Sequence, residues 1–309
     1  MLSHRTLHFT RNQTYWHCAG LAVSSDNSCL DLNGQLLGDR GYYGPDMAIV
    51  SLDRAQTLKR WWNLVTDYSN RSLTFESDKP LALQGIVTML NRHEPDQYWH
   101  GHWRRDLPLG LLWTPLNHVT ESPPARIDDS FPTWSWLSHQ GPVRKRRDYF
   151  SDSVILAEIV NPSWARRNGS EHSKLILNCH VLQASLRSID PEEYFAAKLR
   201  VVAGPRVDQS SQSYALATYM LEGRLDWLGH VKEVVSGDNL VAAIPICQAT
   251  YVSPPLGTSM VLRFLLVIPS NASQHEYRRI GMGEASGVHA ERLMVLMSAT
   301  TERQHIFLV

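Results

Sequence analysis

The sequence is poor in charge, and the charge that it has is balanced. Charged residues make up 19% of the 309 residues, below the roughly 25% of ordinary soluble domains. Lysine and arginine together number 30, as do aspartate and glutamate, so the formal net charge is zero. Proteins that bind nucleic acids usually carry an excess of basic residues that neutralises phosphates. We therefore expect no nucleic-acid partner.

Long apolar segments and cysteine motifs are also lacking. The stretch from Met260 to Pro269 is interrupted by Arg263 and is shorter than the roughly 20 apolar residues of a membrane span. The N-terminal segment MLSHRTLHFTRNQTYW has no apolar core of a secretory signal. The four cysteines have no Cys-x-x-Cys spacing, which argues against a disulfide framework or a zinc site. These absences predict a cytoplasmic protein with reduced thiols and no membrane span.

Familiar catalytic motifs are missing as well. The sequence contains no G-x-S-x-G nucleophile elbow, no phosphate-binding loop and no G-x-G-x-x-G that opens a helix. His100 and His102 form a candidate metal pair, but no third ligand lies at a suitable spacing. We therefore expect neither a cofactor nor a metal.

Apolar and aromatic side chains are abundant, and their spacing predicts the first elements. Apolar residues make up 43% of the chain, and ten residues are tryptophan. Two helices are predicted, one after Ser51 or Asp53 and one from Ser77 or Asp78. The predicted buried stripes are Leu58, Trp61, Trp62, Val65 and Tyr68 in the first helix, and Leu83, Ile86, Val87 and Leu90 in the second.

Alternation and turn residues predict the other elements of the first half. Short strands are expected over residues 5–9 and 13–18. Farther along, we expect a helical turn over 97–106, a buried strand over 110–113, and a strand over 133–137 that places Trp134 and Trp136 on one face. The basic run RKRR at 144–147 is most simply a solvated loop or hairpin, with an anion clamp as the alternative.

Beyond residue 150 the pattern is that of β-structure. Short apolar runs alternate with turn signals rich in proline, glycine and asparagine, which is typical of sandwiches and barrels. We predict an α+β fold, mainly an antiparallel β barrel or sandwich with an N-terminal layer of a few helices. One domain is expected over 1–309, with a helix-containing, Trp-rich half (1–150) and a β-rich half (151–309). The expected strands are 153–160, 174–186, 231–235, 240–246, 258–268, 277–284 and 305–309, with at most a helical insert over 192–199.

Four phrases of the sequence resemble a known family. They are RTLHFTRNQTYWHC from Arg5, WWNLVTDYSNRSLTFESDKPLALQGIV from Trp61, YWHGHWRRDLPLGLLW from Tyr98, and FPTWSWLSHQGPV from Phe131. The first phrase resembles the tail that closes the core of fungal heterokaryon-incompatibility (HET) domain proteins, and the other three resemble the region that follows this core. Family proteins carry that core upstream, and it is compared with TIR domains, which can cleave NAD. The core's opening motif and glutamate-bearing helix are absent here, so the resemblance implies neither NAD cleavage nor cell-death signalling.

The resemblance and the missing motifs leave two hypotheses open. The resemblance implies a role as a cofactor-free cyclase in fungal biosynthesis, because detached relatives of HET proteins serve in this way. The first hypothesis is therefore a cyclase that performs a Diels–Alder-type ring closure on a hydrophobic terpenoid or polyketide inside an aromatic pocket. The second is a non-enzymatic interaction or regulatory module, in which the tryptophans are ordinary core. The candidate catalytic residues are His102, Arg104 and Tyr15, and the candidate substrate-binding residues are Trp16, Trp62, Trp99, Trp103, Trp113, Trp134, Trp136 and His139.

Overall fold

The structure is a computed structural model, and it describes most but not all of the chain. The described residues are 5–9, 14–18, 21–24, 29–30, 54–71, 78–93, 95–116, 131–145, 153–160, 163–167, 170–190, 196–201, 219–225, 240–253, 257–270, 275–300 and 302–309. Contacts divide the chain into two compact units, one of 1–61 and 80–96, the other of 62–79 and 97–309. The expectation of a single domain over 1–309 stays a prediction.

The first unit contains a small antiparallel sheet. Its four strands pair in chain order: β1 (Arg5–Phe9), β2 (Thr14–Cys18), β3 (Leu21–Ser24) and β4 (Cys29–Leu30). Leu7 of β1 is the register partner of Trp16, and His8 is the partner of Tyr15. The two strands predicted near the N-terminus are confirmed.

The two predicted helices are also confirmed. Helix α1 (Arg54–Ser69) begins in the first unit and ends in the second, and α2 (Lys79–His93) belongs almost wholly to the first. Both helices bury the stripes expected from their spacing. The buried residues are Trp61, Trp62, Leu64, Val65 and Tyr68 in α1, and Leu83, Ile86, Val87 and Leu90 in α2, while Leu58 is half-buried.

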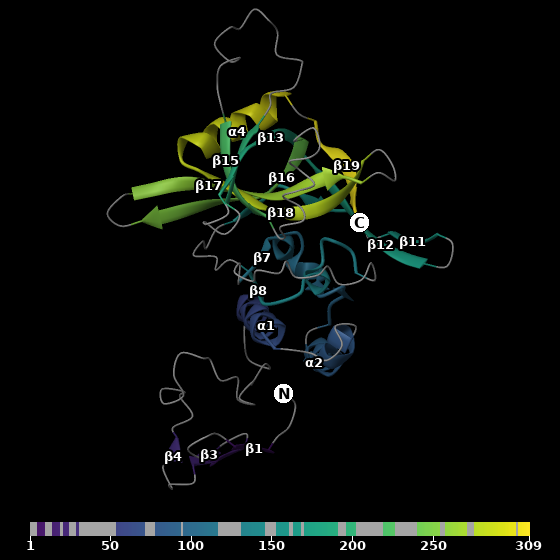
Figure 1. The fold of residues 1–309 in the computed structure, drawn as a ribbon, viewed down its shortest axis with the longest axis vertical. Coiled ribbons are helices and arrows are strands. Elements are labelled where there is room, and N and C mark those ends of the chain that lie inside the picture. Colours follow the sequence, from purple (N-terminus) through teal and green to yellow (C-terminus); the bar gives the residue numbers. More distant parts are fainter. Residues whose placement is uncertain are drawn as a thin grey trace, which may run out of the picture. The chain divides into compact units, whose positions relative to one another are not determined.

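The second unit is built on a mostly antiparallel barrel (Figure 1). Strands β13, β14, β15, β18, β17 and β16 pair in a ring that returns to β13, and β19 adds to β18 in parallel. The strands are β9 (Val154–Ile155), β10 (Glu158–Ile159), β11 (Ser163–Arg167), β12 (Ser170–Cys179), β13 (Leu182–Asp190), β14 (Ala196–Val201), β15 (Tyr219–Leu225), β16 (Leu240–Ser253), β17 (Gly257–Pro269), β18 (Glu276–Ser286) and β19 (Gln304–Leu308). The α+β class with a barrel is thus confirmed.

Side chains that alternate along the barrel strands pack into two separate hydrophobic clusters. Phe264 and Leu266 of β17 pack in one cluster with Leu293 of helix α4 (Val288–Thr300), and α4 lies against β15, β17 and β18 (Figure 1). Leu265 and Val267 belong to the other cluster, which includes Trp134 and residues of the segment 107–112. This second cluster places the Trp-rich segments on the barrel.

Several predictions for the second half need correction. The single strand expected over 174–186 is two strands, β12 and β13, which are separated at His180 and Val181. Part of the expected helical insert, 196–199, lies in β14. Helix α4 had not been predicted. The strand expected over 231–235 lies outside the described residues.

The segment from 98 to 138 differs most from prediction. In place of a helical turn, β5 (Tyr98–Trp99) and β6 (His102–Trp103) form a hairpin. His100 and Gly101 make its two-residue turn with φ of 40° and 89°, which favours glycine at the second position. Short 3-10 helices follow at η3 (Arg104–Asp106) and η4 (Leu109–Leu111). The predicted strand over 110–113 is thus wrong; the strand there is β7 (Trp113–Pro115), paired with β8 (Val143–Lys145).

The strand predicted over 133–137 is also wrong. Residues Trp136–Ser138 form a 3-10 helix, η5, whose start is capped by Ser135. The Ser135 Oγ accepts the Leu137 N–H at 3.0 Å, a local bond that competes with extended structure. Among the described residues, no helix is long and apolar enough to cross a membrane.

The packing of α4 provides a test of the barrel core. Leu293 is fully buried, whereas Val295, two positions on, is 60% exposed. We predict that Leu293→Ala lowers the free energy of unfolding by about 2–5 kcal/mol, because it leaves a cavity in the interior. The matched variant Val295→Ala should change it by less than about 0.5 kcal/mol. Urea titration of both variants measures the difference, and equal effects would contradict the placement of α4.

Candidate functional site

The candidate site is a group of side chains centred on His102, here called the His102 cluster: Trp62, His102, Asp106, Trp134 and Lys145. His102 lies on β6 and has no exposed surface. Its ring centroid is 5.9 Å from that of Trp62 on α1 and 5.7 Å from that of Trp134. An imidazole is therefore enclosed between two indole rings contributed by segments far apart in the sequence.

The His102 imidazole is neutral at physiological pH. Burial lowers its pKa from 6.5 to about 3, and the positive charges of Arg279, Lys145 and His100 act in the same direction. The Trp134 backbone raises the pKa of His102 in the opposite direction, but it does not meet the geometric criteria for a hydrogen bond to the ring. Among the described residues, neither ring nitrogen has a hydrogen-bond partner. Buried polar groups without partners are rare in proteins, and each calls for a structural or functional reason.

Asp106 on η3 is the anionic member of the cluster. Its Oδ2 accepts the Trp62 Nε1–H at 2.6 Å, and its Oδ1 accepts from Lys145 Nζ at 2.8 Å. The Lys145 ammonium also lies over the Trp62 ring, 5.8 Å from the centroid. Both carboxylate oxygens are thus paired, which offsets the cost of burying the charge.

Gly110 on η4 lets Asp106 and His102 approach the same point. A Cβ built on Gly110 would lie 2.7 Å from Asp106 Oδ2 and 3.0 Å from His102 Nδ1. Both distances are shorter than ordinary van der Waals contact, so glycine fits the position best. The Nδ1 atom of the imidazole and the carboxylate oxygen therefore both lie beside Gly110.

Trp113 and Arg279 support the cluster from the barrel side. The Trp113 Nε1–H donates to the Trp134 carbonyl at 3.0 Å. The Arg279 guanidinium on β18 stacks 3.8 Å from the centroid of the Trp113 ring and donates to the Trp113 carbonyl at 2.6 Å and to the Leu111 carbonyl. Arg279 is fully buried, so it links the Trp-rich segments to the barrel wall.

Hydrogen bonds to the backbone fix the turn that precedes His102. The Trp136 Nε1–H donates to the Gly101 carbonyl at 2.7 Å, and the Ser135 hydroxyl donates to the His100 carbonyl at 2.6 Å. A Cβ on Gly101 would lie 2.4 Å from Trp136 Nε1. The position of His102 therefore depends on the η5 segment as well as on its own hairpin.

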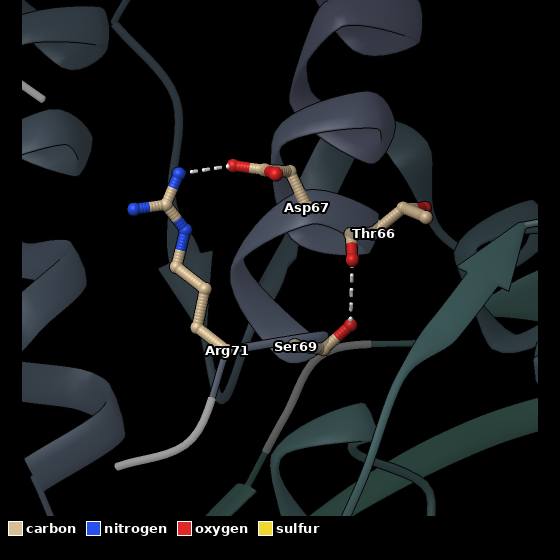
Figure 2. Close-up of polar contacts among 4 residues, drawn as sticks. All are labelled: Thr66, Asp67, Ser69 and Arg71. Carbon is tan, nitrogen blue, oxygen red and sulfur yellow. Dashed lines mark hydrogen bonds and ion pairs between the residues drawn. The ribbon is translucent and has the colours of Figure 1, made fainter. Parts of the chain in front are cut away.

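The end of α1 is tied to the strand that carries Lys145. The Ser69 hydroxyl bonds the Thr66 carbonyl at 3.2 Å (Figure 2) and accepts the Val143 N–H at 2.9 Å. Asp67 and Arg71 form an ion pair of 2.7 Å on the exposed side of the helix (Figure 2). Ser69 thereby links α1, which carries Trp62, to β8, which carries Lys145.

Several of the predicted site residues lie close together. The His102 ring contacts those of Trp62 and Trp134, and Trp113 packs on His139 with centroids 5.8 Å apart. Trp103 packs on Tyr98 at 5.0 Å, and Trp99 is half-buried against the second core. Trp136 joins through the Gly101 bond described above.

The other predicted site residues are Arg104, Tyr15 and Trp16. Arg104 is exposed on η3, away from the interior that holds His102. Tyr15 and Trp16 lie on β2, in the other compact unit, and their side chains fall outside the described part of the structure. Their predicted roles stay predictions.

The sequence analysis missed Asp106, Lys145, Gly110 and Arg279. Asp106 forms an ion pair with Lys145, which lies in the basic run that the sequence predicts as a solvated loop or hairpin. The two residues lie 39 positions apart, so local spacing gives no signal for their contact. Among the described residues, no three His, Cys, Asp or Glu side chains form a group suited to a metal ion.

No family model, no curated protein and no solved structure matches this chain. The resemblance to HET proteins therefore stays a prediction from the sequence phrases alone.

The depressed pKa of His102 predicts a particular pH dependence of stability. Between pH 6.5 and about 3, the unfolded chain binds a proton that the folded protein does not. The free energy of unfolding should therefore fall as the pH falls through this range, by about 1.4 kcal/mol per pH unit from this residue. His102→Phe removes the titrating group and should flatten the profile.

Urea unfolding at several pH values, on wild type and variants, measures the slope. His289, an exposed histidine on α4, supplies the control variant, His289→Phe. If His102→Phe and wild type lose stability in parallel, His102 is not the buried neutral group described here.

Proposed function

We propose that this chain is a cofactor-independent cyclase, acting in the cytoplasm, that closes a ring in a hydrophobic terpenoid or polyketide by a Diels–Alder-type reaction. The observation that carries the proposal is the neutral, unpartnered imidazole of His102 enclosed by Trp62 and Trp134. The resemblance to detached regions of HET proteins belongs to the same proposal.

The reaction class suits the chemistry of this cluster. A Diels–Alder closure forms two carbon–carbon bonds in one step and needs no nucleophile, metal or redox group. It needs a surface that folds the substrate into its reactive shape, which indole faces supply to apolar chains. It is accelerated by a hydrogen bond that shifts electron density in the diene or dienophile, and an imidazole that stays neutral at pH 7 provides one without a charge.

Substrate access requires a change in packing. Trp62, His102 and Trp134 have exposed fractions of 5%, 0% and 1%. A guest reaches these rings only when part of the cover over the cluster moves. The proposal therefore includes an opening step before ring closure, of the kind that limits turnover in many enzymes.

The second candidate is an interaction or regulatory module, and one observation favours it. The indole N–H groups of Trp62, Trp113 and Trp136 all donate to partners within the protein. Tryptophans whose polar atoms are satisfied and whose rings are buried serve fold stability without any guest. Under this alternative, His102 is part of the core.

A panel of linear terpenoid and polyketide trienes tests the proposal. We expect purified protein to raise the rate of cyclisation above that in buffer and to yield one enantiomer in excess, as measured by chiral chromatography. His102→Phe should lower the rate about 30-fold or more, because a well-placed hydrogen bond contributes roughly 2–4 kcal/mol to the barrier.

The exposed-site variant His289→Phe should retain the wild-type rate. If the rate and the enantiomer ratio equal those in buffer for the whole panel, the cyclase proposal fails. Recovery of one stoichiometric protein partner with the chain would then support the interaction module.

A further inference from the structure

The imidazole of His102 carries one N–H and one lone pair while it is neutral. With the proton on Nε2, the ring donates to a guest from that atom. With the proton on Nδ1, it instead accepts at Nε2. The choice between these tautomers decides which functional group on a guest the ring recognises.

The surroundings of Nδ1 favour the proton there. Asp106 Oδ2 and His102 Nδ1 both lie beside Gly110, at 2.7 and 3.0 Å from a Cβ built on that residue, which puts the carboxylate among the groups near Nδ1 although the two are not hydrogen-bonded. A carboxylate on this side attracts an N–H and repels a lone pair, and such a neighbour commonly sets the tautomer of a histidine.

Asp106 is held firmly enough to exert this effect. Its two oxygens accept hydrogen bonds from Trp62 Nε1 and Lys145 Nζ at 2.6 and 2.8 Å, so the carboxylate has little freedom to turn away. The rival acceptor is the Trp134 backbone, which also favours an N–H on His102. Its carbonyl accepts the Trp113 Nε1–H at 3.0 Å and makes no hydrogen bond with either ring nitrogen of His102.

We propose that Asp106 is a positioning residue that holds His102 in the Nδ1–H tautomer, so that Nε2 presents a lone pair to an apolar guest carrying a hydroxyl group. The guest rests on the proposed function, but the tautomer does not. In the cyclisation, a hydroxyl on the diene donates to Nε2 and becomes richer in electron density, which activates the diene. The proton stays on the hydroxyl, so no further reactant is needed.

The tautomer is measured without any guest by nitrogen-15 NMR of the imidazole rings. The His102 signals are assigned by their loss in His102→Phe. We expect the wild-type protein to show a protonated Nδ1 and an unprotonated Nε2. A protonated Nε2 in the wild type, with or without a proton on Nδ1, overturns the proposal.

Two variants separate positioning from general stability. Asp106→Asn should shift the population at least threefold toward the Nε2–H tautomer. The matched change Asp67→Asn, which removes an exposed carboxylate from its ion pair with Arg71 (Figure 2), should leave the tautomer unchanged. An unaltered tautomer in folded Asp106→Asn contradicts the role of Asp106. If that variant does not fold, the wild-type spectrum decides alone.

The hydroxyl preference is tested with two probes of similar size, naphthol and methoxynaphthalene, by tryptophan fluorescence. We expect naphthol to bind about fivefold more tightly, as one hydrogen bond provides, and the preference to vanish in His102→Phe. Equal binding to the wild type overturns the hydroxyl preference. If neither probe binds, the guest and the proposed function fail together, while the NMR result still judges the tautomer.

Discussion

The buried carboxylate of Asp106 is the contact on which the arrangement around His102 depends. It binds the indole of Trp62 on α1 and the ammonium of Lys145 on β8, and so joins three segments that local sequence alone would not bring together. Leaving either partner unpaired in the interior is costly, because a buried charge or N–H then lacks a partner. Removing the carboxylate would therefore disturb Lys145 and also Trp62, which packs on the imidazole.

The barrel provides the rigid base for this arrangement. One face of β16, β17 and β18 packs on the segment 107–112 and on Trp134, while the other face packs on α4. Arg279 crosses from β18 to the Trp113 ring and to two backbone carbonyls. Because these contacts join irregular segments to regular strands, the segments around His102 keep a defined shape with little secondary structure of their own.

Some regular elements could be predicted from sequence, whereas α4 was missed and part of β14 was expected to be helical. The stripe from Trp61 to Tyr68 identified α1, and the apolar runs separated by turn residues after residue 240 identified β16 and β17. The segment from 98 to 138 could not be predicted, since its conformation is set by distant partners. The indole N–H of Trp136 donates to the Gly101 carbonyl, and that of Trp113 donates to the Trp134 carbonyl. Neither hydrogen bond produces a periodic pattern in the sequence.

The sequence predicted several of the residues in the site but not the contacts between them. His102 and most of the candidate tryptophans were identified because aromatic residues gather in the first half of the sequence. Asp106 and Lys145 were missed, because each stands in a run of charges that suggests solvent exposure. Only the fold buries Asp106 and partly buries Lys145, so that the two charges pair.

The most direct test of this account is the titration of His102 itself, followed through its ring protons by NMR as the pH is lowered. A fully buried imidazole beside Lys145 and Arg279 is predicted to remain neutral through pH 6.5 and to take up a proton only near pH 3, if the protein is still folded there. A midpoint close to 6.5 in the folded protein would contradict the account, because it would mean that water reaches the ring.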